Sequence, residues 1–247
     1  MSRRSKRRRL DQYLVEHGLA ESRAKAAGLI LAGLVKVNGQ PVGKAGSAVP
    51  EGALVEVAGP EHPYVSRGGL KLEGALKHFS LAPKGWRCLD VGASTGGFTD
   101  CLLQHGAARV TALDVGYGQL AWKLRQDKRV ECIERVNVRH LHEDVAPGPF
   151  DLIVVDVSFI SLTLVTPPLL PRLKPGGRLL VMVKPQFEAG KGQVGSGGVV
   201  RDQAVQQACV DKVATHLAGL SLRIIGRCPS PITGPKGNQE HFLLAQA

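Results

Sequence analysis

The stretch of sequence that most restricts the fold is LLVMV, residues 179–183, which is followed directly by Lys184 and Pro185. Five consecutive apolar residues, with no alternation of polar and apolar positions, are typical of a β-strand that is buried on both faces. Pro185 ends this strand, because proline has no backbone N–H to donate to a neighbouring strand. The run therefore predicts a strand inside a sheet that helices cover on both sides.

Strand and helix signals alternate from residue 68 to the end of the chain. Strands are expected in WRCLDVGAS, ARVTALDVG, VECIERVN, FDLIVVDVSF, GRLLVMVKP, SLRIIGRC and EHFLLAQA. Helices are expected in LKLEGALKHF, GGFTDCLLQHG, QLAWKLRQD and residues 202–218. Alternation at this spacing predicts an α/β fold with a doubly wound, mainly parallel sheet in residues 68–247.

A smaller unit precedes this sheet. Apolar residues at helical spacing indicate two short helices, of which Gly18 would end the first and Ser22 would cap the second. The pair Asn38-Gly39 predicts a tight turn between two short strands, and GALVEVAG predicts another strand. We therefore expect a small α+β domain in residues 1–60 with a basic N-terminal arm, and a linker at residues 61–67.

The charge of the chain restricts its partners. The 32 Lys and Arg residues exceed the 21 Asp and Glu residues, which gives a net charge of +11 and favours a polyanionic partner, either nucleic acid or an anionic membrane. No apolar run approaches the ~18 residues of a membrane helix, and no apolar segment follows the basic N-terminus as in a signal peptide. The five cysteines form no CxxC pair, so we expect no metal site, no disulfides and a cytoplasmic location.

The sequence LDVGASTGGFTD, residues 89–100, lies where the first strand of the sheet turns into a helix. Glycines there would let the backbone approach a ligand, but the pattern is neither GxGxxG nor a phosphate-binding loop. Asp114 ends the second strand about 20 residues further on, where a carboxylate can accept ribose hydroxyls. The third strand ends near Asn137, whose amide could reach an adenine edge. This set suits S-adenosyl-L-methionine, which has a ribose and an adenine but no phosphate; the alternative is an ordinary glycine-rich turn. The predicted cofactor-binding residues are Asp90, Gly92, Ser94, Thr95, Gly96, Gly97, Phe98, Asp114, Asn137 and Asp156.

Two strands that should be neighbours end in charged residues. Asp156 ends the fourth strand and Lys184 ends the fifth, so their side chains should share one crevice at the carboxyl edge of the sheet. Lys71 lies on the helix that enters the domain, and Glu240 starts the last strand. Each residue alone has an ordinary explanation, such as a lysine whose stem covers apolar surface or a solvated charge. Together they predict a catalytic site that contains two lysines and two carboxylates.

Several motifs resemble one protein family. They are SRGGLKLEGAL, DVGASTGGFTD, DVGYGQLAWKLR, DVSFISL, VKPQFEAGKGQVGSGGVVRD and GNQEHF, and they are similar to those of the TlyA family of bacterial RNA 2′-O-methyltransferases, some of which are called hemolysin A. The catalytic domain of this family resembles FtsJ and has a Lys-Asp-Lys-Glu tetrad, which Lys71, Asp156, Lys184 and Glu240 match. Residues 8–60 resemble the RNA-binding domain named after ribosomal protein S-four.

The resemblance implies a fold and a reaction. The fold would be a Rossmann-like S-adenosylmethionine-dependent methyltransferase sheet, mostly parallel with an antiparallel last strand. The reaction would be 2′-O-methylation of a cytidine in ribosomal RNA or a ribosomal subunit. Because the chain ends at Ala247, just after the last strand, large-subunit rRNA is favoured over small-subunit rRNA. Tyr64 stands where the family has Trp in its linker, and no basic residue precedes it there.

A ribose 2′-hydroxyl is hardly ionised at neutral pH, so its methylation requires in-line positioning and help with one proton. Lys184 is our candidate to hold or deprotonate this hydroxyl, with Lys71 and Asp156 setting its charge state and Glu240 orienting the network. The sequence leaves open whether Lys184 acts as a base or stabilises the developing alkoxide. We interpret residues 186–198, rich in glycine, as a lid over the RNA site, with a loop of no function as the alternative.

Basic residues predict the RNA contacts. Residues 3–9 hold six basic residues in seven positions, and residues 67–247 carry +7 of the net charge, so RNA should cross both domains. Ordinary surface charge is the alternative for each position. The predicted RNA-binding residues are Arg3, Arg4, Lys6, Arg7, Arg8, Arg9, Arg23, Lys25 and Arg67.

Three rival functions remain to be weighed. A membrane-active hemolysin would need an amphipathic or transmembrane segment, which the sequence lacks. An RNA-binding assembly factor with an inactive methyltransferase fold would not need the tetrad. A base methyltransferase would need an Asn/Asp-Pro-Pro-aromatic stretch or a cysteine after the fourth strand, where the chain has DVSF.

Overall fold

The computed structural model describes residues 8–20, 22–31, 33–57, 62–190 and 192–247. The chain divides into two compact units, Met1–Pro63 and Tyr64–Ala247, and each is described by itself. The expected linker, residues 61–67, therefore overlaps the second unit. Tyr64 is buried against Gly69, where an added Cβ would lie 2.1 Å from the Tyr64 ring, and the Val65 N–H donates to Asp100 Oδ2 at 2.8 Å. These contacts attach the last four linker residues to the second unit.

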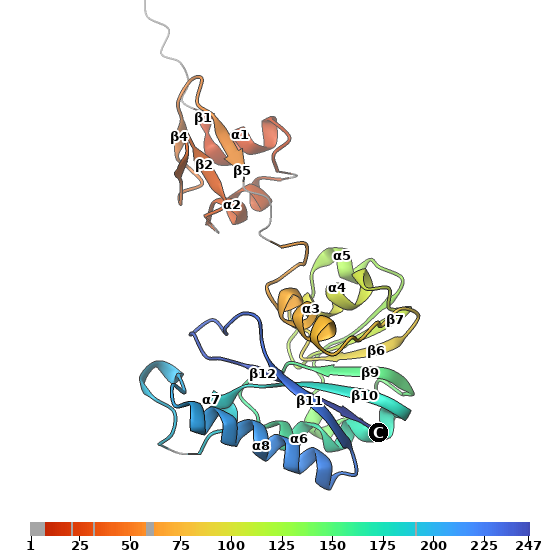
Figure 1. Cartoon of the computed structure of the whole chain (residues 1–247). Helices are drawn as coiled ribbons and strands as arrows, with labels where there is room; N and C mark the ends of the chain where they lie inside the picture. Colours follow the sequence, from red (N-terminus) through yellow and green to blue (C-terminus); the bar gives the residue numbers. More distant parts are fainter. Residues whose placement is uncertain (1–7, 21, 32, 58–61, 191) are drawn as a thin grey trace, which may run out of the picture. The chain divides into compact units, whose positions relative to one another are not determined.

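The described part of the first unit is built from two helices and short strands (Figure 1). The helices are α1 (Leu10–Glu16) and α2 (Arg23–Leu31). One sheet contains β2 (Val35–Val37), β3 (Gln40–Pro41) and β5 (Val55–Val57), in the order β3-β2-β5. A second, two-stranded sheet pairs β1 (Arg8–Arg9) with β4 (Ala48–Val49). The predicted details are confirmed, because Gly18 has a φ of +70° after α1 and the Lys25 N–H donates to Ser22 Oγ. Asn38 and Gly39 also both have positive φ, as a tight hairpin turn requires.

The described residues of the second unit form a seven-stranded sheet in the order β11-β12-β10-β9-β6-β7-β8. Its strands are β6 (Arg87–Val91), β7 (Arg109–Leu113), β8 (Val130–Ile133), β9 (Phe150–Val155), β10 (Leu173–Val183), β11 (Arg223–Pro229) and β12 (His241–Gln246). Neighbouring strands from β10 to β8 are parallel, whereas β12 is antiparallel to both of its neighbours. This arrangement confirms the predicted mostly parallel sheet with an antiparallel last strand.

Helices cover both faces of this sheet (Figure 1). Helices α3 (Gly68–His78), α4 (Gly97–Gln104) and α5 (Trp122–Arg125) lie on one face, and α6 (Leu162–Val165) and α8 (Gln203–Gly219) lie on the other, where α7 (Pro185–Glu188) packs on α8. Short 3₁₀ turns complete the unit at η1 (Val138–His140), η2 (Pro167–Arg172) and η3 (Ser196–Gly198). Helix α5 is shorter than the expected QLAWKLRQD, because Ala121 is extended and its N–H donates to Thr95 O.

The run at residues 179–183 is buried on both faces, as predicted. Leu180 and Met182 contribute to the core beneath α3 and α4, while Leu179, Val181 and Val183 contribute to the core beneath α8. The strand thus places Lys184 at the carboxyl edge of the sheet, between two packed layers that hold its backbone. In the described ranges, no helix is both long and apolar enough to cross a bilayer.

Candidate active site

A cavity of about 840 Å³ opens at the carboxyl edge of the sheet in the second unit. Lys71, Asp156, Lys184 and Glu240, the predicted tetrad, all line it. They reach it from different elements, since Lys71 lies on α3, Asp156 follows β9, Lys184 follows β10 and Glu240 precedes β12. The structure therefore brings the four side chains to one site, as the strand order requires.

Lys184 and Asp156 form an ion pair, with Lys184 Nζ 2.6 Å from Asp156 Oδ1. Among the residues that the structure describes, Asp156 Oδ1 accepts no hydrogen bond. The hydrogen bond from Lys184 Nζ goes to Ser158 Oγ, at 3.0 Å. Sequence reasoning missed Ser158, although its place two residues after Asp156 in DVSF was a usable signal.

Lys71 and Glu240 form a second ion pair, and it is more deeply buried. Lys71 Nζ donates to Glu240 Oε2 at 2.5 Å, and their side chains are 11% and 2% exposed. Lys71 Nζ also lies 4.0 Å from the sulfur of Met182, two residues before Lys184. The tetrad is thus arranged as two lysine–carboxylate pairs at one cavity, and the role predicted for Lys71, to help set the charge state of Lys184, stays a prediction.

The glycine loop after β6 supplies a wall of the cavity through Gly92, Ser94, Thr95, Gly97 and Phe98. Gly92 has a φ of +85°, and a Cβ there would lie 2.6 Å from the backbone oxygen of Asp156. Gly96 has a φ of +98°, and a Cβ there would lie 2.3 Å from a methyl group of Leu124. Glycine is therefore required at these two positions because the loop packs closely against other parts of the protein. Gly92 approaches the end of β9, and Gly96 approaches α5.

Asp90 does not line the cavity, in contrast to the prediction that it contacts a cofactor. It is completely buried in β6, where Thr99 Oγ1 donates to its Oδ2 at 2.7 Å. Its Oδ1 has no hydrogen-bond partner among the described residues. Burial raises the pKa of Asp90 to about 7, against the hydrogen bond from Thr99, and the charge of Asp156 raises it further. The sequence could not show this, because a strand residue's burial depends on what packs above it.

We expect Asp90→Asn to change the pH dependence of stability. A carboxyl whose pKa rises from about 4 in the unfolded chain to about 7 in the folded one destabilises the fold as pH increases through this interval, by up to about 4 kcal/mol above it. Asn has no such titration, and its oxygen can still accept from Thr99. Thermal unfolding should therefore show similar Tm values for both proteins near pH 4, and a Tm for the variant higher by about 5 °C or more at pH 8. Parallel pH profiles would contradict this expectation.

Asp114 directly follows β7, and Asn137 comes four residues after the adjacent strand β8, as the cap of η1. Both residues lie outside the lining of the cavity. Asp114 accepts the Ser94 N–H and the Gly116 N–H, each at 2.7 Å, and thereby ties the glycine loop to its own strand end. Asn137 is exposed, and its side-chain oxygen accepts the Arg139 N–H. The half-buried carboxylate retains lone pairs for a ribose diol, and the amide of the exposed Asn137 has two N–H donors. The residues present therefore fit an adenosine group at this edge.

The predicted RNA-binding residues differ in their surroundings. Arg3, Arg4, Lys6 and Arg7 lie outside the described residues. Arg9 and Arg23 both donate to the buried Asp11 at 3.0 Å, and these hydrogen bonds, led by that from Arg9, hold the pKa of Asp11 well below its usual range.

The remaining members of this set are all exposed. Arg8 forms an exposed ion pair with Glu16 at 3.6 Å, and Lys25 is exposed on α2. Arg67 lines the cavity and donates to Thr233 O at 3.3 Å. Arg67 therefore lies beside the tetrad.

The strand order, the glycine loop after the first strand of the sheet and the cavity at the carboxyl edge define a methyltransferase fold. N-methyltransferase NodS from Bradyrhizobium japonicum, solved in complex with S-adenosyl-L-homocysteine, has this fold, with a TM-score of 0.53, 17% identity and coverage of 73% of this chain and 88% of that one. The family of FtsJ-like methyltransferases matches residues 64–247, and the S4 domain matches residues 8–55.

Full-length relatives narrow this class to one family. The chain is 50% identical over 240 residues to the 16S/23S rRNA (cytidine-2′-O)-methyltransferase TlyA of Mycobacterium tuberculosis, covering 97% of this chain and 90% of that protein. It is 41% identical to Hemolysin A of Brachyspira hyodysenteriae, covering 96% and 100%. A solved structure described as a hemolysin from Streptococcus thermophilus has a TM-score of 0.75 and 41% identity, covering 97% and 88%. The chain belongs to the TlyA family of FtsJ-like methyltransferases, which confirms the resemblance drawn from its motifs.

Proposed function

We propose that this protein transfers a methyl group from S-adenosylmethionine to the 2′-hydroxyl of a cytidine in ribosomal RNA. The observation that carries the proposal is the pair of buried lysine–carboxylate contacts, Lys184–Asp156 and Lys71–Glu240, at one cavity beside the glycine loop. The Mycobacterium tuberculosis relative, named for this reaction on 16S and 23S rRNA, supports the substrate class.

The carboxyl edge of the sheet has separate places for the cofactor and the ribose. Asp114 and Asn137 would hold the adenosine group, and Ser94 and Thr95 of the glycine loop would lie along the cofactor toward the cavity. When bound, S-adenosylmethionine supplies an electrophilic methyl group on a sulfonium. Asp90 lies beneath this loop and supports it through its hydrogen bond with Thr99, and it would not contact the cofactor itself.

Lys184 is placed to assist the ribose oxygen. An ammonium has three N–H donors, and Ser158 takes one while Asp156 contacts the group as a counter-ion. A donor therefore remains for the 2′-oxygen, where a positive charge stabilises the alkoxide that develops as the hydroxyl proton passes to a water molecule in the open cavity. The pairing with Asp156 supports this stabilising role over the role of a base. The Lys71–Glu240 pair would hold the opposite wall of the same cavity in place.

The first unit and the basic surface would bind the RNA. Arg9 and Arg23 keep about half of their side-chain surface exposed while bound to Asp11, so each can contact a phosphate without losing that ion pair. Arg67, at the cavity, would meet the RNA close to the modified nucleotide. The proposed partner is ribosomal RNA or a ribosomal subunit, and the proposed location is the cytoplasm, where this substrate occurs.

The test is to map 2′-O-methyl groups on ribosomal RNA from cells with and without the protein, by mass mapping and by primer extension at limiting nucleotides. We expect a cytidine to lose its 2′-O-methyl group when the gene is removed and to regain it with the wild-type protein, but not with Lys184→Ala. An unchanged map would reject the proposal. Regain of the methyl group with Lys184→Ala would instead reject the assigned role of this lysine.

A further inference from the structure

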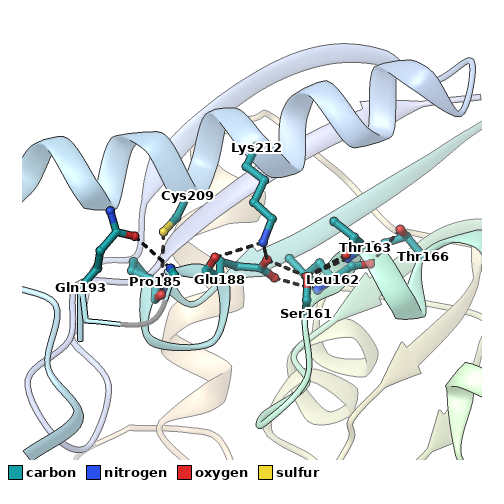
Figure 2. Close-up of polar contacts among 10 residues, drawn as sticks. Ser161, Leu162, Thr163, Thr166, Pro185, Glu188, Gln193, Cys209 and Lys212 are labelled. Carbon is teal, nitrogen blue, oxygen red and sulfur yellow. Dashed lines mark hydrogen bonds and ion pairs between the residues drawn. The ribbon is translucent and has the colours of Figure 1, made fainter.

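Glu188 is a buried carboxylate that the reaction just described does not use. It is the last residue of α7, four residues after Lys184, and its side chain is 2% exposed. A carboxylate with so little exposure requires partners, because an uncompensated buried charge is strongly unfavourable. Figure 2 shows these partners, which come from α6 and α8.

Both oxygens of Glu188 are engaged. Oε1 accepts the backbone N–H of Leu162 at 2.7 Å, and Oε2 accepts the hydroxyl of Ser161 at 2.7 Å (Figure 2). Lys212 of α8 donates to Oε2 at 3.1 Å and to the backbone oxygen of Glu188 at 3.0 Å. Glu188 therefore binds the N-terminus of α6 through two hydrogen bonds, and the ammonium of Lys212 offsets its charge.

These contacts join the two segments that carry the catalytic pair. Residues 156–161 connect Asp156 and Ser158 to the start of α6, and residues 184–188 connect Lys184 to the end of α7. At the cavity the segments meet through the contacts of Lys184 with Asp156 and Ser158, at 2.6 and 3.0 Å. At their far ends they meet through Glu188. The segments are thus linked at both ends.

Helix α7 needs this support. It is a single turn, which has little stability of its own. Helix α8 packs against α7 and binds it at two points (Figure 2). The Cys209 thiol contacts Pro185 O at 3.8 Å, and Lys212, one turn further along α8, binds Glu188. Because α8 packs against α7 and Glu188 is bound to the start of α6, these contacts restrict movement of the Lys184 backbone relative to Asp156.

We propose that Glu188 is a positioning residue for methyl transfer, which holds Lys184 at the geometry that Asp156 and Ser158 require. This inference rests on the proposed function. Misplacement of a reacting group by about 1 Å can cost about 10²-fold in rate, so loss of this link should lower turnover without weakening substrate binding. Glu188 would act through Lys184 and would touch neither the RNA nor the cofactor.

The variant Glu188→Gln tests this role with little change in size. Its oxygen can still accept the Leu162 N–H, but its amide nitrogen cannot accept the Ser161 hydroxyl and has no charge to pair with Lys212. We expect kcat for rRNA methylation to decrease about 10- to 100-fold, while the KM values for S-adenosylmethionine and RNA stay within about twofold. The matched control is Asp211→Asn, which removes an exposed carboxylate from α8 and its ion pair with Arg227, and which should retain wild-type kcat.

A double-mutant comparison separates positioning from general destabilisation. If Glu188 acts through Lys184, Glu188→Gln should produce almost no further loss in a Lys184→Ala background, measured as single-turnover rates. A structural role would give the same fold-loss in both backgrounds. Equal losses, or a wild-type kcat in Glu188→Gln, would overturn the inference.

A second measurement does not depend on the reaction. Acetylation of lysines by limiting acetic anhydride, followed by mass spectrometry, reports how freely each Nζ reacts. In Glu188→Gln, labelling of Lys184 should accelerate several-fold, while that of Lys174, at the other end of the same strand, should not change. Unchanged labelling of Lys184 would reject the positioning role. If the wild-type protein methylates no rRNA, the proposed function is rejected. A difference in Lys184 labelling between the wild-type protein and Glu188→Gln would still show that Glu188 holds Lys184 in place.

Discussion

Lys184→Ala is expected to lower kcat for rRNA methylation by about 10²- to 10³-fold, the usual cost of losing a donor that stabilises a developing oxyanion. Affinity for S-adenosylmethionine should stay within about twofold, because Lys184 lines the cavity, whereas Asp114 and Asn137, which would hold the adenosine group, lie outside its lining. Single-turnover methyl transfer and calorimetric binding of the cofactor measure the two quantities separately.

The chain contains a matched control for this substitution. Lys174 lies at the start of the same strand, β10, and forms an ion pair with Asp151 of β9, so it repeats the Lys184–Asp156 arrangement at the opposite edge of the sheet. Lys174→Ala should leave kcat unchanged. If it lost as much activity as Lys184→Ala, or if Lys184→Ala lost cofactor binding, the assigned role would be wrong.

Gly92→Ala is expected to abolish measurable binding of S-adenosylmethionine and to destabilise the second unit by about 3 kcal/mol or more. The positive φ of +85° alone costs an alanine about 1–2 kcal/mol. The added Cβ would also lie 2.6 Å from the backbone oxygen of Asp156, so either the glycine loop or the end of β9 must move. Cofactor titration and chemical unfolding provide the two measurements.

Gly85→Ala separates the two causes. Gly85 precedes β6 at the opposite edge of the sheet and has a φ of +77°, but no atom lies within 4 Å of its added Cβ. This variant should lose only about 1–2 kcal/mol of stability and keep its cofactor affinity. Equal effects of the two alanines would show that backbone strain, and not the contact with Asp156, explains the requirement for glycine at position 92.

Most of the sheet could be predicted from the sequence, because buried strands and amphipathic helices have distinct periods that packing then enforces. The run at residues 179–183 predicted β10, and its burial on both faces followed from the absence of alternation. The predictions of secondary structure were less accurate for short elements, whose few residues show no clear hydrophobic period. Helix α5 is one turn instead of nine residues, and the two-residue strands β1 and β4 have no periodicity to detect.

The active site could be predicted in part. Asp156 and Lys184 could be placed together from the ends of adjacent parallel strands, a consequence of topology. The inaccessibility of Asp90 could not be predicted, since the strand position that suggested cofactor contact also allows complete burial beneath α4. The contact of Asp114 with the glycine loop was missed for a similar reason, because a backbone N–H partner leaves no trace in residue types.

The sequence by itself determined the order and type of the seven strands of the large sheet and of the longer helices, and the edge at which a ligand would bind, because these follow from hydrophobic period and chain connectivity. Only the tertiary structure decided which charges pair. Lys71 meets Glu240 across 169 residues, and Glu188 meets Ser161, which caps α6, and Lys212 of α8. The reason is physical, since the direction of a buried side chain is set by the packing of segments that are distant along the chain.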